Sequence, residues 1–171
     1  MNKIAKFEKV SFEQFKKDYI DCFSECDEIK IKEIYDSIKL PKRATKGSAG
    51  YDFYSPITFT LKPSECIKIP TGIKARIKEG QFLAMYVRSS IGFKYGVVLS
   101  NGTGVIDGDY YNNEGNEGHI FIKLVNLSTE GKTLHCNKGD AIAQGIFMNY
   151  DVAVDDVADG ERTGGIGSTG K

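Results

Sequence analysis

Hydrophobic residues follow a helical period near the start of the chain. Four aromatic residues recur there at spacings of three or four positions: Phe12, Phe15, Tyr19 and Phe23. This spacing is typical of one face of an amphipathic helix. Ser11 stands just before the run and Gln14 three residues after it, which is the spacing of a capping box. The pattern predicts an N-terminal helix that packs on the main body of the protein.

After about residue 28 the hydrophobic pattern changes to short β-branched runs separated by Gly, Pro, Asn and Ser. The strand candidates are residues 67–69, 73–77, 82–87, 97–99, 120–125 and 142–147. Turn signals recur about every 8–12 residues, which favours an antiparallel sandwich, barrel or jelly roll. We expect no second helix and find no repeat of solenoid length. The fold class predicted is mainly β.

The end of the chain is rich in Gly and Ser. A stretch of this composition buries too little apolar surface to order itself, so residues 155–171 are predicted to form a flexible tail. The expected organisation is a helical extension over residues 1–37, packed on the same domain as the β-rich residues 38–154.

Composition and charge limit the function classes. The chain has 171 residues with 23 basic and 23 acidic side chains, so its formal net charge is zero. A neutral chain is not suited to coating nucleic acid, and a bound polyanion must be held by a few placed cations. No apolar run approaches the roughly 20 residues of a membrane span, and the first residues lack the apolar run of a signal peptide. We therefore expect a cytoplasmic protein without nucleic acid or membrane partners.

The four cysteines, Cys22, Cys26, Cys66 and Cys136, are too few and too scattered to indicate a disulfide framework. Cys22 and Cys26 could face one way on a helix. A zinc site there would need two further ligands, and the two histidines lie far along the chain. Free, mostly buried thiols are expected.

Three local patterns are candidates for parts of a functional site. Arg88-Ser89-Ser90 combines a cation with two hydroxyls at the end of an apolar strand, which suits an anionic group. Asp107 emerges at a turn after two apolar residues, where it could serve as a general base or a metal ligand. A turn-capping aspartate would show the same pattern. Arg162 opens the glycine-rich tail, whose backbone N–H groups could close over a phosphate.

Taken in order, five segments resemble the motifs of the trimeric dUTPase family, the deoxyuridine triphosphate nucleotidohydrolases. The segments are Ala49-Gly50-Tyr51-Asp52-Phe53-Tyr54; Arg88-Ser89-Ser90 with Gly92 and Lys94; Gly104-Val105-Ile106-Asp107-Gly108-Asp109-Tyr110; Lys138-Gly139-Asp140-Ala141-Ile142-Ala143-Gln144; and Arg162 to Gly170. The resemblance runs from about residue 38 to the end. Five motifs in the right order are far more specific than any one of them.

The resemblance implies a jelly-roll or distorted β-barrel subunit and a homotrimer whose active sites are each shared by all three chains. It implies hydrolysis of dUTP to dUMP and pyrophosphate by attack of water on the α-phosphorus. This activity keeps uracil out of DNA and supplies dUMP for thymidylate synthesis. Mg²⁺ would bridge the three phosphates and keep mostly water as ligands, with Asp52 holding the water shell.

The resemblance also assigns roles to residues. Asp107 would activate the attacking water, and the ring of Tyr110 would pack on the deoxyribose and leave no room for a 2′-hydroxyl. The uracil pocket would comprise Asn101, Gly104, Val105, Ile106 and the strand near Phe121. The phosphate ligands would be Arg88, Ser89, Ser90, Gln144 and Arg162, and the tail residues Ile166, Gly167, Ser168 and Thr169 would close over the substrate.

Two features depart from the family pattern. Residues 111–117 are inserted after the tyrosine of the third motif, and their polarity predicts a surface loop near the nucleoside pocket. Ile166 stands where the family has an aromatic residue that stacks on uracil. We hypothesise that Phe121 supplies this aromatic surface, because it interrupts an aliphatic run at the pocket-side position. A phenylalanine packed against another subunit would fit the sequence as well.

Two alternative functions remain. A dCTP deaminase shares the fold and the Arg-Ser-Ser segment, but it carries a glutamate in the strand after the third motif, where this chain has Lys123. A non-catalytic nucleotide-binding or regulatory module could use the N-terminal helix and the insert as interaction surfaces. The presence of Asp107, Tyr110 and Arg162 argues against lost catalysis.

Overall fold

The computed structural model of the chain describes residues 5–160, 162 and 164. The described strands are β1 (Lys6–Lys9), β2 (Lys42–Arg43), β3 (Tyr51–Tyr54), β4 (Phe59–Leu61), β5 (Cys66–Pro70), β6 (Ile73–Arg76), β7 (Gln81–Val87), β8 (Val97–Leu99), β9 (Gly104–Ile106), β10 (Phe121–Asn126), β11 (Leu134–Cys136) and β12 (Ala141–Asn149). The helices are α1 (Phe12–Phe23), α2 (Glu28–Asp36), α3 (Ser89–Tyr95) and the 3₁₀ turn η1 (Gly108–Tyr110). The fold is mainly β and jelly-roll-like, as predicted.

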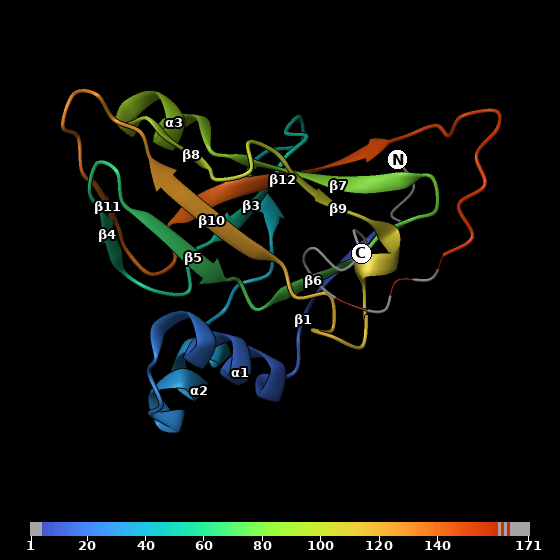
Figure 1. Cartoon of the computed structure of the whole chain (residues 1–171). Helices are drawn as coiled ribbons and strands as arrows, with labels where there is room; N and C mark the ends of the chain where they lie inside the picture. The colour runs from blue at the N-terminus through green and yellow to red at the C-terminus, as the bar shows by residue number, and fades with distance from the viewer. Residues whose placement is uncertain (1–4, 161, 163, 165–171) are drawn as a thin grey trace.

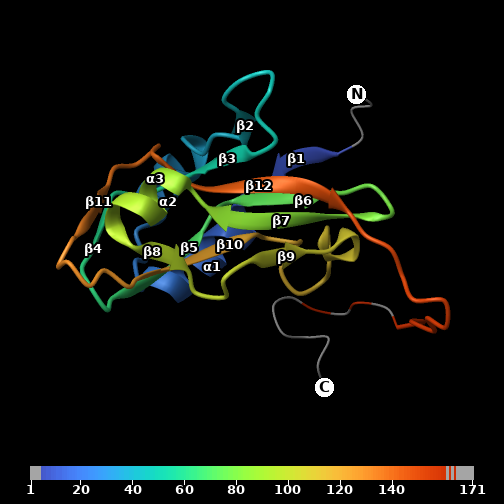
Figure 2. The ribbon, with the colours of Figure 1, turned by 90° about the horizontal axis from the view of Figure 1, so that it is seen from above.

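The strands pair antiparallel throughout and form two larger sheets. One has the order β2-β3-β12-β7-β9 and the other the order β5-β10-β8, while β1 pairs with β6 and β11 with β4. Figure 2 shows β3, β12, β7 and β9 side by side. Buried and accessible residues alternate along β10, which is the pattern of a strand with one face on a core.

A single hydrophobic core joins the two sheets. Phe53, Leu83 and Ile142 from the larger sheet are at most 1% exposed. The same holds for Ile69 and Ile122 from the smaller sheet, and all five belong to one cluster. The strands that carry candidate site residues are therefore held in place by the packed side chains on their core-facing side.

Helix α1 forms where the aromatic pattern predicts it. Phe15 and Tyr19 are its buried residues, and the Ser11 hydroxyl accepts a hydrogen bond from the Gln14 N–H at 3.1 Å. The reciprocal half of the expected capping box is absent, because the Ser11 N–H donates to Oε2 of Glu117 at 2.9 Å. The helix start is thus fastened to the segment inserted after the third motif.

The expectation of a single helix is wrong, because α2 and α3 also form. Asp27 caps α2 by accepting hydrogen bonds from the N–H groups of Ile29 and Lys30 at 3.0 and 3.2 Å. Ile31 and Ile34 are the buried residues of α2. Figure 1 shows α1 and α2 next to β5, on the side away from β7 and β12. In the described part of the chain, no helix has the length and apolar character needed to cross a membrane.

Candidate active site

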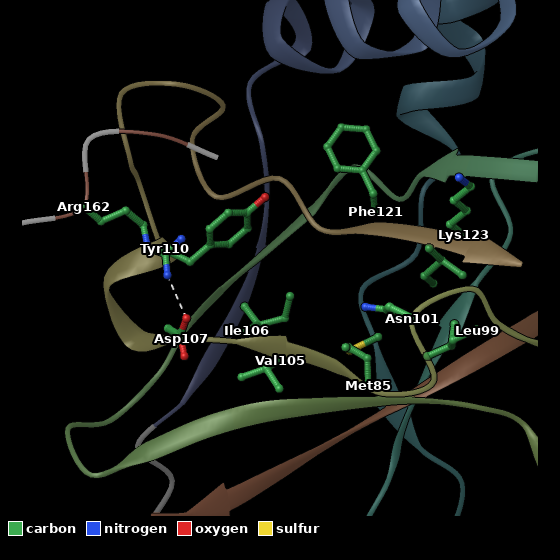
Figure 3. Close-up of a pocket in the computed structure, with 12 residues that line it drawn as sticks. Met85, Leu99, Asn101, Val105, Ile106, Asp107, Tyr110, Phe121, Lys123 and Arg162 are labelled. Carbon is green, nitrogen blue, oxygen red and sulfur yellow. Dashed lines mark hydrogen bonds and ion pairs between the residues drawn. The ribbon is translucent and has the colours of Figure 1, made fainter. Parts of the chain in front are cut away.

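A pocket of about 260 Å³ opens between the β9–η1 segment and β10 (Figure 3). Its lining residues are Met85, Leu99, Asn101, Gly104, Val105, Ile106, Asp107, Tyr110, Phe121, Ile122, Lys123 and Arg162. The structure thus gathers eight of the residues expected at the site: Asn101, Gly104, Val105, Ile106, Asp107, Tyr110, Phe121 and Arg162. A concave pocket with a few polar groups among apolar side chains is typical of a small-molecule site.

Pairing with β7 places the Asp107 carboxylate at the pocket. In the β7–β9 pair Ile106 lies opposite Leu83 and Gly104 opposite Met85, so Asp107 comes at the free end of β9. A Cβ at Gly104 would lie 3.0 Å from the Met85 Cβ, so the close approach of the two strands favours glycine there. Asp107 precedes η1 but makes no side-chain capping hydrogen bond to it. The turn-capping alternative therefore has no support in the geometry, and the carboxylate is free for other partners.

Arg162 is the direct partner of this carboxylate. Its Nη2 donates to Oδ2 of Asp107 at 2.7 Å, and its Nε donates to Oδ1 of Asp109 at 2.9 Å. The guanidinium carbon lies 5.6 Å from the centre of the Tyr110 ring. Figure 3 shows the side chains of Asp107, Tyr110 and Arg162 meeting at one end of the pocket. A guanidinium held by two carboxylates and a ring face can exchange these partners for phosphate oxygens.

Tyr110 is held rigidly beside the pocket. Its hydroxyl donates to the backbone carbonyl of His119 at 2.8 Å and accepts a hydrogen bond from Nδ2 of Asn116 at 2.8 Å. Burial raises the pKa of the Tyr110 phenol above its ordinary value, so the side chain is neutral at physiological pH. Its ring is therefore a fixed apolar wall with one polar edge.

The segment after Tyr110 is not the simple surface loop expected from its polarity. Asn113 is buried, and its Nδ2 donates to the Tyr110 carbonyl at 2.7 Å. Gly118 has φ +79°, and a Cβ there would lie 2.5 Å from the Tyr110 carbonyl oxygen, so only glycine fits. The insert folds back under Tyr110 and supports it.

Sequence reasoning missed four residues of the pocket: Met85, Leu99, Ile122 and Lys123. A usable signal existed for Lys123. Residues two apart on a strand share a face, so the placement of Phe121 at the pocket implies Lys123 there as well. The other three are apolar residues of the core strands, which no local pattern separates from ordinary packing residues.

The residues expected to bind phosphate form a second cluster. Asp52 of β3 lies opposite Gln144 of β12, and the Arg88 Nε lies 3.3 Å from Oδ1 of Asp52. A Cβ at Gly50 would lie 2.5 Å from Oε1 of Gln144, so this glycine makes room for the amide. Ser89 begins α3 and is exposed. The cluster offers an arginine, hydroxyls and an amide, which are donors suited to phosphate oxygens.

The second cluster borders a pocket of its own. Arg88 and Ser90 line a space of about 290 Å³, together with Lys94 and His135. No residue lines both this pocket and the one at Asp107. The two clusters therefore belong to different openings in a single chain.

The distance between the clusters follows from β7. Arg88 comes five positions after Leu83, which pairs with the last residue of β9. Five residues of extended chain span about 16 Å at roughly 3.3 Å per residue. This backbone separation favours phosphate ligands for the Asp107 site that come from another copy of the chain.

Among the described residues, no three His, Cys, Asp or Glu side chains converge in a way that could hold a metal ion. Asp52 contacts Arg88 in the second cluster, and Asp140 lines the pocket that the cluster borders. So few carboxylates beside hydroxyl and amide donors fit a Mg²⁺ ion that keeps its waters and is bound mainly by phosphates. The tail positions Ile166, Gly167, Ser168 and Thr169 lie outside the described residues.

Comparison with known proteins points to one family. A family model described as dUTPase matches residues 36–170. A deoxyuridine 5′-triphosphate nucleotidohydrolase of Lactococcus lactis is 48% identical over 135 residues, covering 78% of this chain and 89% of the relative. The relative of the same name from Finegoldia magna is 41% identical over 139 residues, covering 77% and 91%.

Solved structures with a similar fold include members of the same family. The crystal structure of the dUTPase from Streptococcus mutans superposes with a TM-score of 0.63 at 33% identity and covers 86% of this chain and 97% of that chain. A mutant dUTPase from phage phi11 of S. aureus, described with a coordinated structural Mg(II) ion, gives a TM-score of 0.60 at 22% identity, covering 91% and 97%. The second match bears on the fold alone. Helix α1 and strand β1 precede the region matched by the family model.

Proposed function

Because the chain belongs to the dUTPase family, we propose that it hydrolyses dUTP to dUMP and pyrophosphate. The observation that carries this proposal is the pocket in which Asp107, Tyr110 and Asn101 converge. The carboxylate can activate water, the aromatic ring can exclude a ribose hydroxyl, and the side-chain amide can hydrogen-bond a pyrimidine. The bordering Val105 and Ile106 would offer backbone groups to the base.

In this mechanism Asp107 is the general base. Its carboxylate accepts a proton from water as the water oxygen attacks the α-phosphorus. The bond between the α-phosphorus and the oxygen that bridges to the β-phosphorus breaks, and pyrophosphate leaves with that oxygen. Half of the Asp107 side chain is exposed, so water and substrate have access to it. The residue must release Arg162 before it can take the proton, and the phosphates supply the exchange partner for the guanidinium.

The phosphates would be bound by Arg88, Ser89, Ser90, Gln144 and Arg162. Since Arg88 lies about 16 Å along β7 from the Asp107 end, we propose that these ligands come from a neighbouring copy in a homotrimer. The tail residues Ile166, Gly167, Ser168 and Thr169 would close over the bound nucleotide. Asp52 would hold the water shell of Mg²⁺, and the bound ion would neutralise phosphate charge.

The test of this function is pyrophosphate release by the full-length protein with Mg²⁺, using dUTP, dCTP, dTTP and UTP in parallel. We expect rapid release from dUTP and at least about 100-fold lower kcat/KM for the other three, because a polar site rejects analogues that leave its groups unpaired. Ammonia release from dCTP would instead identify a deaminase. A folded protein that releases neither product would overturn the catalytic proposal and favour a binding module.

Phe121 is proposed to cover the uracil in place of the aromatic residue missing at Ile166. It lines the pocket, and its ring is 4.7 Å from the His119 ring, with the Lys68 ammonium 4.5 Å from the ring centre. Base stacking on an aromatic ring is worth about 1–3 kcal/mol, so Phe121→Ala should raise the KM for dUTP about tenfold. Phe121→Tyr keeps the ring and should restore a near-normal KM. An unchanged KM in Phe121→Ala would show that the ring only packs.

A further inference from the structure

His119 is a wholly buried histidine between the N-terminal helix and the pocket. Its Nε2 lies 2.7 Å from the backbone N–H of Gly72 and its Nδ1 lies 2.6 Å from Oδ2 of Asp18. A backbone amide can only donate, so Nε2 is the acceptor and carries no proton. The proton of the neutral ring is therefore on Nδ1, where it is donated to Asp18.

The environment of Asp18 of α1 favours the ionised carboxylate that accepts this hydrogen bond. Burial raises the pKa of Asp18, but hydrogen bonds from His119 and Gln14 outweigh it, so the net shift is downward. Gln14 Nε2 donates to the same Oδ2 at 2.8 Å. Removal of the carboxylate would leave the His119 N–H buried without its partner, which is costly.

His119 contacts two pocket residues through different atoms. Its backbone carbonyl accepts the Tyr110 hydroxyl at 2.8 Å, and its ring lies 4.7 Å from the ring of Phe121 with an interplanar angle of 38°. Both Tyr110 and Phe121 line the pocket, whereas His119 and Asp18 do not. Figure 3 shows the N-terminal helices beyond Phe121, on the side away from Asp107.

The segment that leads to His119 is fastened to the same N-terminal region. The Glu117 carboxylate accepts hydrogen bonds from the Ser11 backbone and hydroxyl at the start of α1, and Lys74 lies 3.3 Å from it. At the other end of the insert the Tyr111 hydroxyl donates to Glu8 of β1. The β1–α1 region thus holds residues 111–119 at three places.

We propose that Asp18, which precedes the region matched by the family model, is a positioning residue for the nucleoside pocket and acts through His119 on Tyr110 and Phe121. This role rests on the proposed function, since it takes the pocket to be the nucleoside site. Asp18 touches neither Asp107 nor Arg162, so its loss weakens binding of the nucleoside and leaves the chemical step intact.

The test compares Asp18→Ala with Glu13→Ala in the full-length protein. Glu13 lies on the same helix and is exposed, and its ion-pair partner is Lys16 of that helix, at 3.0 Å. We expect Asp18→Ala to raise the KM for dUTP about 5-fold to 20-fold with kcat within about twofold, because contacts to the nucleoside are made equally in the ground and transition states, and their loss raises KM alone. Asp18→Asn retains an oxygen that accepts from Nδ1 and should recover most of the loss. Glu13→Ala should match wild type.

Two further measurements separate positioning from loss of stability. Ile31→Val removes one buried methyl group from α2 without touching His119, and it should lower the thermal midpoint while leaving the KM unchanged. The chain has two histidines, so nitrogen-15 NMR can resolve the His119 ring, which should carry its proton on Nδ1 in wild type and lose this preference in Asp18→Ala.

The possible results distinguish failure of the positioning role from failure of the proposed function. An active wild type together with an unchanged KM in Asp18→Ala would overturn the positioning role alone. A KM increase of equal size in Ile31→Val would also overturn it, because general weakening of the N-terminal region would then suffice. A folded wild type without dUTP hydrolysis would overturn the proposed function and this role with it.

Discussion

Replacing Asp107 with asparagine is expected to lower kcat for dUTP about 10³-fold and to leave the KM within about threefold. A positioned general base contributes roughly 10²–10⁴ to the rate, and the asparagine amide cannot accept the proton. Asn has the same shape, and its Oδ1 can still accept the hydrogen bond that Arg162 Nη2 now donates to Asp107 at 2.7 Å. The loss should therefore fall on the chemical step and spare binding. Steady-state pyrophosphate release with dUTP and Mg²⁺ measures both constants.

Asp109→Asn is the matched control for this variant. Asp109 also accepts a hydrogen bond from Arg162, at 2.9 Å, but it does not line the pocket. Its replacement should change kcat by less than about threefold, since it removes charge near Arg162 without removing the base. A kcat for Asp107→Asn within tenfold of wild type would exclude Asp107 as the base. Equal losses in the two variants would assign the effect to Arg162 instead.

The sequence predicted best those features that depend on residues close together along the chain. The strand runs around Ile69, Leu83 and Ile142 were predicted, because alternating or continuous apolar residues bounded by turn residues have few other uses. Most of the residues that line the pocket were expected from the resemblance to the family, and five of them belong to one segment. Gly104 to Tyr110 is one continuous segment, so its residues reach the same place whatever the rest of the chain does.

Helix α2 was missed because its pattern has two interpretations. Ile29 and Ile31 alternate with lysines at the period of a strand, whereas the buried pair is Ile31 and Ile34, at a helical spacing. Ile29 is 76% exposed, so it contributes little to the core, although it completes the alternating pattern. The deciding signal was the capping residue Asp27, which lies directly before the helix.

Long-range polar contacts could not be predicted from the sequence. Asp18 and His119 are 101 positions apart, and each resembles an ordinary surface residue in its local sequence. The burial of Asn113 has the same origin, since a polar insert normally indicates a loop in solvent. These contacts depend on how the N-terminal region packs against the insert, which is decided by tertiary structure.

Mixing two inactive variants should restore activity if the site is shared between chains. Asp107→Asn removes the base, and Arg88→Ala removes a phosphate ligand from the second cluster. In a homotrimer assembled from equal amounts of both, a site that takes Asp107 from one chain and Arg88 from its neighbour is intact in about a quarter of cases. Refolding the two together, or co-expressing them with different tags, should therefore recover about a quarter of wild-type activity, against almost none for either alone.

The control for mixing uses two variants from the same cluster. Gln144 of β12 lies opposite Asp52 of β3, whose carboxylate contacts Arg88, so Arg88→Ala and Gln144→Ala damage one cluster on one chain. Their mixture should stay inactive, because no chain then carries a complete phosphate site. Native mass spectrometry of the tagged mixture confirms that mixed trimers form. If they form and the Asp107→Asn and Arg88→Ala mixture remains inactive, each site lies within one chain. The roughly 16 Å between the Asp107 end of β7 and Arg88 would then have to close on substrate binding.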